Sequence, residues 1–248
     1  MSFKDKRIII TGAGRGLGAA FAVTLADAGA DVIMTGRNVE NMASLAESIR
    51  LRTGKRPQTL HIDHADISQV TLAAKKMRDE GTPVDILINN AAQWLPGSMD
   101  SHDAFAIANT ITGNVIGNLL FTRGLLPLLE KSGAGDILNV ISTSGMHNVS
   151  LQGASVAYVA SKHGQTGFTD ALRQELRGRC VRVSGIYPPN IGNISPLDEE
   201  AWNAVPDKLS WPTNRDVVEA ALFALSRPRH LTISSLMLES DTGNFHAY

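Results

Sequence analysis

Short runs of β-branched and aliphatic residues alternate with longer helical patterns along this chain of 248 residues. Such alternation is typical of βαβ units built around a parallel sheet. The runs Ile8–Ile10 and Ile86–Ile88 are continuously apolar, as expected for strands that helices cover on both faces. We therefore expect an α/β protein with a doubly wound, mostly parallel seven-stranded sheet flanked by helices. The expected strands are Arg7–Thr11, Asp31–Thr35, Gln58–Ile62, Val84–Asn89, Asp136–Ser142, Val181–Tyr187 and Leu231–Leu238.

No strong linker, repeat or low-complexity segment interrupts this pattern, so we expect one domain over residues 1–248. The irregular segment is Pro188–Asn214, which contains prolines at 188, 189, 196, 206 and 212. It follows an expected strand, and open α/β sheets bind ligands beyond the carboxyl ends of their strands. Segment 188–214 is therefore predicted to be a substrate-binding flap.

The composition excludes several classes of partner. A formal net charge of −1 with dispersed Lys and Arg gives no basic patch for nucleic acid or an anionic membrane. Cys180 is the only cysteine, which rules out an intrachain disulfide and a multi-cysteine metal site and fits a reducing compartment. Without a signal-like N-terminus or an uninterrupted apolar run of roughly 18 residues, we expect a cytoplasmic protein with neither a nucleic acid nor a membrane as partner.

A glycine-rich turn, Thr11–Gly18, joins the first expected strand to a helix that should begin near Leu17. Gly12, Gly16 and Gly18 follow a G-x-x-x-G-x-G spacing. Glycines permit positive φ, and they let backbone N–H groups approach a pyrophosphate whose charge the helix N-terminus favours. Directly after a buried strand, this turn predicts dinucleotide binding.

The end of the second expected strand indicates which dinucleotide binds. An NAD site usually carries an acidic residue there for the ribose 2′-hydroxyl, whereas an NADP site has an arginine nearby. This chain has Gly36 and Arg37 at that point, and Arg15 adds a second cation in the glycine turn. We therefore expect NADP(H) to be favoured over NAD(H).

Tyr158 and Lys162 lie four residues apart in a helical pattern, so their side chains share one helix face about 5–6 Å apart at Cβ. An opposite charge within about 4–6 Å favours the phenolate and lowers the pKa of a tyrosine from about 10. Tyr158 is thus a candidate general acid or base.

Taken in order, these features resemble the short-chain dehydrogenase/reductase family over essentially the whole chain. The matching pieces are the Thr11–Gly18 turn, Asp66 with Ile67, the stretch Asn89–Ala92, Asn114, Ser142, and Tyr158 with Lys162. The resemblance implies a Rossmann fold and an oxidoreductase that interconverts a ketone or aldehyde and an alcohol by hydride transfer, with no metal.

The resemblance also implies residue roles. Tyr158 would be the general acid in carbonyl reduction and the general base in alcohol oxidation. Ser142 would bind the substrate oxygen, with Ser144 as the alternative. Lys162 would hold the nicotinamide ribose and lower the pKa of the tyrosine, and Asn114 would hold a water in the proton relay behind the lysine.

The residues expected to contact the cofactor come from the turn, the strand ends and the catalytic helix. Asp66 should bind the adenine by a hydrogen bond and Ile67 should pack on it. The full expected set is Gly12, Arg15, Gly16, Leu17, Gly18, Arg37, Asp66, Ile67, Asn89, Ala91, Tyr158, Lys162, Pro188 and Ile191.

Two departures from the family pattern bear on the site. Pro189 stands where glycine is common after the sixth strand, which should stiffen that loop. Ala92 stands where glycine is usual, which is tolerable unless the position demands positive φ. Five residues are expected to surround the substrate end and to favour an apolar or aromatic substrate: Trp94, Met146, Tyr187, Trp202 and Trp211.

Two other functional classes remain open. A non-catalytic dinucleotide-binding regulator could use the same fold, but it would be expected to lose the acid/base residues. A sugar-nucleotide epimerase or dehydratase would be expected to show another glycine spacing and a larger C-terminal region. Helices Asn114–Lys131 and Val156–Gly178 resemble those through which family members pair, so a homodimer or homotetramer is expected.

Overall fold

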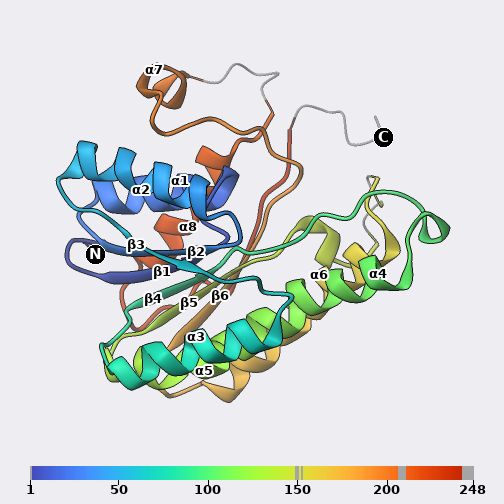
Figure 1. Ribbon diagram of the computed structural model, residues 1–248, viewed down its shortest axis with the longest axis horizontal. Coiled ribbons are helices and arrows are strands. Elements are labelled where there is room, and N and C mark those ends of the chain that lie inside the picture. The colour runs from blue at the N-terminus through green and yellow to red at the C-terminus, as the bar shows by residue number, and fades with distance from the viewer. Residues whose placement is uncertain (1, 149–150, 152, 206–210, 242–248) are drawn as a thin grey trace.

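The computed structural model describes residues 2–148, 151, 153–205 and 211–241. A seven-stranded sheet runs through the middle of the molecule in the order β3-β2-β1-β4-β5-β6-β7 (Figure 1). Every neighbouring pair of strands is parallel. The strands are β1 (Arg7–Thr11), β2 (Asp31–Gly36), β3 (Gln58–His61), β4 (Ile86–Asn89), β5 (Asp136–Val140), β6 (Arg182–Tyr187) and β7 (Ser235–Met237).

Helices cover both faces of the sheet, as Figure 1 shows. One face carries α1 (Gly16–Asp27), α2 (Val39–Thr53) and α8 (Asn214–Leu225). The other carries α3 (Ile67–Glu80), α5 (Asn118–Lys131) and α6 (Val156–Glu175). The remaining helices are α4 (Ala104–Ile111), the π-helical turn Thr112–Gly117 that joins it to α5, the short α7 (Glu199–Asn203), and the 3₁₀ turns Met99–Ser101 and Thr143–Gly145.

The continuous apolar strands are explained by two separate cores. Ile8 and Ile10 pack with α1, α2 and α8, whereas Ile9 between them packs with the helices on the opposite face. Side chains alternate across a strand, so a strand buried on both faces must be apolar at every position. The expected doubly wound α/β fold is confirmed.

The expected strands differ from the observed ones mainly at their ends. β5 stops at Val140, because Ser142 opens a turn in which its Oγ accepts a hydrogen bond from the Ser144 N–H at 3.1 Å. β7 begins at Ser235 rather than at Leu231. The carbonyl of Leu231 instead accepts a hydrogen bond from the Arg182 guanidinium at 2.8 Å.

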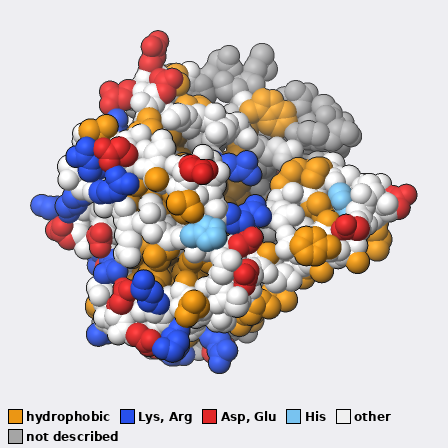
Figure 2. Space-filling model, viewed as in Figure 1, with side chains coloured by type: hydrophobic (Ala, Val, Ile, Leu, Met, Phe, Trp, Pro, Cys, Tyr) orange, Lys and Arg blue, Asp and Glu red, His pale blue; other side chains and the backbone are white. Residues whose placement is uncertain are grey.

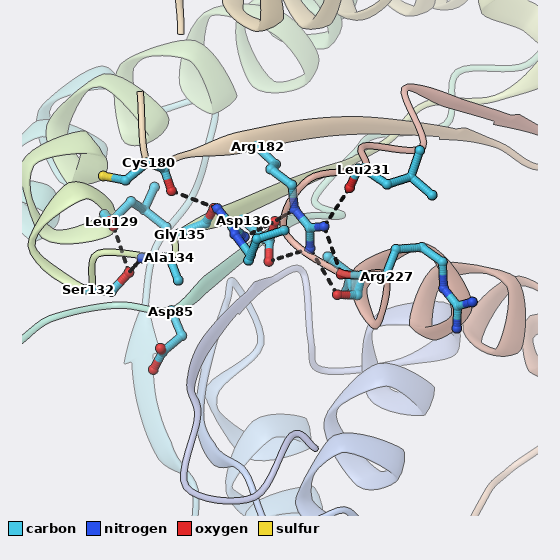
Figure 3. A network of polar contacts seen from close by, with 12 residues as sticks. Asp85, Leu129, Ser132, Ala134, Gly135, Asp136, Cys180, Arg182, Arg227 and Leu231 are labelled. Carbon is cyan, nitrogen blue, oxygen red and sulfur yellow. Dashed lines mark hydrogen bonds and ion pairs between the residues drawn. The ribbon is translucent and has the colours of Figure 1, made fainter. Parts of the chain in front are cut away.

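Arg182 lies at the end of the sheet opposite the carboxyl ends of the strands and organises a buried polar network (Figure 3). Its guanidinium donates to both carboxylate oxygens of Asp136, at 2.7 and 3.1 Å, and to the carbonyls of Leu225 and Arg227 at 3.0 and 2.9 Å. Arg229 adds a contact to Asp136 at 3.0 Å. These bonds attach the end of α8 and the following loop to β5 and β6.

The helical stretch Ala104–Lys131 is long and apolar enough, by length and composition alone, to cross a membrane. About a third of its most apolar window is buried (33%): α5 packs on α3, α4 packs on α6, and Phe121 and Leu125 are fully buried. It also carries the buried polar side chains of Asn114 and Asn118. The stretch therefore packs on the sheet through one face.

Replacing Arg182 by leucine should destabilise the fold by about 3–5 kcal/mol, because removing one partner of a buried ion pair leaves the other poorly compensated. Asp136 would keep Arg229 but lose two hydrogen bonds, and four backbone carbonyls would lose a donor. Urea unfolding measures the change. Arg50→Leu, which breaks an exposed pair with Glu47, is the control and should cost little; equal losses in the two variants would contradict the assignment.

Candidate active site

The site lies where the chain connections leave the sheet in opposite directions. β1 pairs with β2 on one side and β4 on the other, and ligands bind at such a point beyond the carboxyl ends of the strands. Two adjoining cavities of about 430 and 180 Å³ open there and share Leu17, Asn90 and Ala92. The larger, which we call the groove, is lined by the glycine turn and by residues after β2, β3 and β4; the smaller, which we call the catalytic cavity, is lined by residues after β4, β5 and β6 and by α6.

The glycine turn is a close-fitting cradle at the start of α1. Gly12 has a φ of +66°, and a Cβ added to Gly18 would lie only 2.2 Å from the Gly12 carbonyl oxygen. The Asn90 side chain ties the turn to the end of β4 by donating to the Thr11 carbonyl at 2.9 Å. Larger residues at these glycines would close the backbone surface that a phosphate needs.

Two arginines line the groove beside this cradle. Arg15 and Arg37 are exposed, and among the residues the structure describes neither has an acidic partner within 4.0 Å. Gly36 is buried beside Met42, whose sulfur would lie 3.2 Å from an added Cβ. Figure 2 shows Lys and Arg side chains along the hollow of this face. The groove thus offers unpaired positive charge beside the phosphate cradle.

The expectation for Asp66 and Ile67 is wrong. Asp66 is the N-cap of α3, where its carboxylate accepts from the N–H groups of Ser68 and Gln69 at 2.9 and 3.1 Å. Ile67 is the first residue of that helix and is 45% exposed. Neither residue lines the groove.

The residues that do line the groove after β3 are Asp63, His64 and Ala65. Two signals in the sequence could have shown this: Asp63 follows the strand more closely, and the spacing of Asp66 and Gln69 is typical of a helix start. Burial lowers the pKa of His64 to about 4, and its ring packs edge-on against Phe121. The ring is therefore neutral at pH 7, and neither of its nitrogens has a hydrogen-bond partner among the described residues.

The two residues expected at the cofactor after β4 lie differently. Ala91 lines the groove, but Asn89 points away from it, because its buried side chain donates to Thr122 and Asn139 at 2.8 Å. Asn90 takes the place expected for Asn89. Ala92 also lines both cavities, and its φ is not positive, so the missing glycine causes no strain.

After β6, Pro188, Pro189 and Asn190 line the catalytic cavity. Ile191, expected at the cofactor, packs against the hydrophobic core instead. Of the flap predicted for segment 188–214, residues 206–210 lie outside the described part of the chain. In the described portion, the Asn214 side chain makes hydrogen bonds to the Asn193 side chain and to the Ile194 backbone.

The catalytic cavity brings together Ser142, Tyr158 and Lys162 from two elements. Ser142 follows β5, and Tyr158 and Lys162 lie one turn apart on α6, whose start Ser155 caps. Ser142 makes a side-chain hydrogen bond to the Tyr158 phenol. Ser144 also lines the cavity, but Ser142 is the serine bonded to the phenol, which favours Ser142 of the two alternatives.

The expected lowering of the tyrosine pKa is wrong for the protein without a ligand. Burial raises the pKa of Tyr158 to about 12, and the Ser142 hydrogen bond offsets this only in part. Burial also lowers the pKa of Lys162 to about 7. Both shifts have one cause, since removing either group from water penalises its charged form. The lysine Nζ lies 5.5 Å from the centroid of the Tyr158 ring.

Behind the lysine, Asn114 has protein partners at all three of its oxygen and side-chain nitrogen atoms. Its Oδ1 accepts from the Gln93 N–H at 2.7 Å, and its Nδ2 donates to the Gln93 carbonyl and the Ser161 hydroxyl. Its carbonyl accepts from the side-chain amides of Gln165 and Asn118 at 2.8 and 2.9 Å. The water contact expected at Asn114 would have to replace one of these bonds.

Trp94 forms the aromatic wall of the catalytic cavity. Its ring meets the Tyr158 ring edge-on, with the centroids 4.6 Å apart, and it is 48% exposed. Of the five residues expected around the substrate end, Trp94 is the one that lines this cavity within the described residues. Tyr187 is buried within β6 and Trp202 packs on the core, so the expectation is wrong for these two.

Comparisons with known proteins agree with this arrangement. A model of the family described as short chain dehydrogenase matches residues 6–203. An uncharacterized oxidoreductase of Staphylococcus saprophyticus is 30% identical over 236 residues, covering 95% of this chain and 97% of that protein. The chain belongs to the short-chain dehydrogenase family and is an oxidoreductase of that family.

Solved structures show the same similarity. A putative short chain dehydrogenase from Escherichia coli CFT073 complexed with NADPH has a TM-score of 0.80 and 28% identity, covering 95% of this chain and 98% of that one. A metagenomic short-chain oxidoreductase in complex with NADP has a TM-score of 0.78 and 26% identity, covering 96% and 98%. The whole described sheet therefore has counterparts of the same family.

The buried lysine predicts a pH-dependent effect of Lys162→Met on stability. The folded-state pKa of about 7 lies below the unfolded value of about 10.4, so the lysine destabilises the fold fully below pH 7. The penalty falls as the pH rises from about 7 to about 10.4, because the folded protein releases the lysine proton at a lower pH than the unfolded chain does. In urea unfolding, Lys162→Met should therefore gain more stability relative to wild type at pH 6 than at pH 9.5. The exposed Lys75→Met is the control, and a gain independent of pH at Lys162 would refute the assignment.

Proposed function

We propose that this protein is an NADP(H)-dependent oxidoreductase that interconverts a ketone or aldehyde and an alcohol by hydride transfer, with Tyr158 as the general acid or base. The observation that carries the proposal is the joining of two sites: a cavity with Ser142, Tyr158 and Lys162 opens directly into a groove with a glycine cradle and unpaired arginines. A nucleotide bound along the groove would present its reactive end to the catalytic cavity.

The groove residues fit a dinucleotide with an additional phosphate. The turn Gly12–Gly18 and the start of α1 would hold the pyrophosphate. Arg15 and Arg37 would bind the 2′-phosphate, since neither has an acidic partner among the described residues and Gly36 leaves no carboxylate to repel it. When bound, the cofactor supplies a hydride to the carbonyl carbon. The NADP and NADPH complexes of similar proteins support this assignment.

The protein side of the reaction is proton donation and orientation. A pKa of about 12 keeps Tyr158 protonated at neutral pH, which is the state a proton donor needs. The Ser142 hydroxyl would hold the substrate oxygen beside the phenol, and Lys162 would bind the nicotinamide ribose. In the reverse direction the same phenol would accept the proton of the alcohol, so Tyr158 would serve as acid or base according to the direction of the reaction.

The cavity walls suggest the kind of carbonyl compound. Trp94, Val140, Ile141 and Pro188 give the cavity apolar walls beside its polar residues, which suits a carbonyl compound with an apolar portion. Pro188, Pro189 and Asn190, at the start of segment 188–214, line the cavity and would contact the substrate. Exposed apolar side chains on the helices expected to pair, such as Ile116, Leu119 and Val156, are consistent with a proposed homo-oligomer.

A panel of ketones, aldehydes and alcohols, followed by the absorbance of reduced nicotinamide with both cofactors, tests the proposal. On the best substrate, Tyr158→Phe should lower kcat by about 10²–10⁴-fold, while the Kd for NADPH changes little. Tyr187→Phe, which removes a buried phenol outside the cavity, should retain turnover. Binding of NADPH without turnover of any compound would favour the regulator instead, and normal activity of Tyr158→Phe would refute the mechanism.

The arginines predict the cofactor preference. Wild type should bind NADPH more tightly than NADH in a fluorescence titration. Arg37→Ala and Arg15→Ala should each weaken NADPH binding about tenfold or more, because a hydrogen bond to a charged group contributes about 1.5–3 kcal/mol, and should leave NADH binding almost unchanged. Arg56→Ala, an exposed arginine paired with Glu47, is the control. Equal dissociation constants for the two cofactors in wild type would sink the assignment.

A further inference from the structure

Gln165 lies one turn beyond Lys162 on the buried face of α6. It is 4% exposed, and Lys162 is 2% exposed. The interval of three residues places their side chains on the same face of the helix. Gln165 lines neither the groove nor the catalytic cavity, so it lies behind the lysine rather than beside a bound substrate.

The Gln165 side chain bridges the lysine to the π-helical turn between α4 and α5. Its Oε1 accepts a hydrogen bond from Lys162 Nζ at 2.8 Å, and its Nε2 donates to the Asn114 carbonyl at 2.8 Å. The second lone pair of that carbonyl is taken by the Asn118 side chain at 2.9 Å. The amide therefore fills the path between the ammonium and the carbonyl.

We propose that Gln165 is a positioning residue for Lys162, and that its amide fixes the lysine and separates the catalytic cavity from the Asn114 carbonyl. This inference rests on the proposed function, because it concerns the lysine of the same site. A carboxamide accepts a hydrogen bond at its oxygen and donates one at its nitrogen, but it does not pass a proton on as a hydroxyl or a water does.

The amide also supplies the polar partner that a buried ammonium requires. A buried charge without a hydrogen-bonding partner is far costlier than a paired one. The Thr169 hydroxyl donates to the backbone carbonyl of Gln165 at 2.7 Å, and not to the side-chain amide that holds the lysine. The lysine is thus held by a neutral acceptor of fixed position.

Few charged groups face this lysine. Tyr158 is the other ionisable residue among the described residues that line the cavity around it. The elements after β1, β4, β5 and β6 contribute neutral residues there, among them Leu17, Asn90, Ser142 and Pro188, and the π-helical turn contributes the neutral Asn114. A substitution at position 165 should therefore shift the pKa of Lys162 with little contribution from other charged groups.

Three variants on α6 test the proposal. Gln165→Met keeps the length and removes the amide, and Gln165→Glu keeps the acceptor and adds a charge. Thr169→Val is the matched control, since it removes a buried polar group one turn further along the helix. The measurements are kcat and KM for NADPH, the pH profile of kcat, the melting temperature, and the titration of the Lys162 side chain by ¹⁵N NMR in the cofactor-free protein.

We expect Gln165→Met to lower kcat at least tenfold and to move both the Lys162 titration and the alkaline decline of kcat to lower pH. Gln165→Glu should move both to higher pH, because a neighbouring carboxylate favours the charged lysine. Thr169→Val should keep the wild-type kcat and titration, whatever its melting temperature.

The proposal is overturned if Gln165→Met and Gln165→Glu leave the lysine titration at its wild-type pH, or if Thr169→Val reproduces their kinetic effects. The NMR titration needs no turnover. It therefore tests the role of Gln165 even if wild type reduces no carbonyl compound, an outcome that would refute the proposed function alone. If Gln165→Met does not fold, the Lys162 titration in Gln165→Glu tests the proposal alone. A shift to higher pH supports the proposal, and an unchanged titration overturns it.

Discussion

The parallel pairing of β1 with both β2 and β4 determines where every functional side chain lies. Because these strands point the same way, their carboxyl ends meet at one edge of the sheet. After β1 the chain passes to one face of the sheet, and after β4 it passes to the other. A crevice therefore stays open between the two connections, at the carboxyl ends of these strands. The glycine turn after β1, Asn90 after β4 and the residues after β5 therefore lie close together at this edge of the sheet.

Burial is the second constraint, and it sets the chemistry of the catalytic cavity. Tyr158 and Lys162 are held on a helix face that packs against the sheet, so both lose the solvation of their charged forms. The tyrosine is a weak acid that stays protonated, and the lysine is only partly charged near neutral pH. Ser142 hydrogen-bonds to Tyr158, and Gln165 accepts a hydrogen bond from Lys162. Such contacts contribute more energy where water is excluded.

Much of the fold could be predicted from the sequence, because buried parallel strands leave a continuous apolar pattern that few other structures share. The glycine turn and the residues Ser142, Tyr158 and Lys162 could be placed for a related reason: their spacing is fixed by local geometry. Asp66 was misplaced because a carboxylate after a strand can serve either a ligand or the next helix, and only the capping bonds decide between these roles.

Gln165 and the pKa shifts could not be predicted in the same way. The bond from Gln165 to Asn114 joins residues 51 positions apart, and it depends on how the π-helical turn approaches α6. The direction of the tyrosine shift depends on how deeply the phenol is buried, whereas helical spacing reveals only its neighbours. Asn89 illustrates the same limit, since its orientation follows from Thr122 and Asn139 on other elements.

The most direct test of the account is a crystal structure of the protein with NADPH bound. The account predicts that the pyrophosphate lies on the Gly12–Gly18 turn, the 2′-phosphate contacts Arg15 and Arg37, and the nicotinamide enters the cavity lined by Ser142, Tyr158 and Lys162. A nucleotide bound in the groove with its nicotinamide outside that cavity, or bound elsewhere on the protein, would contradict the account.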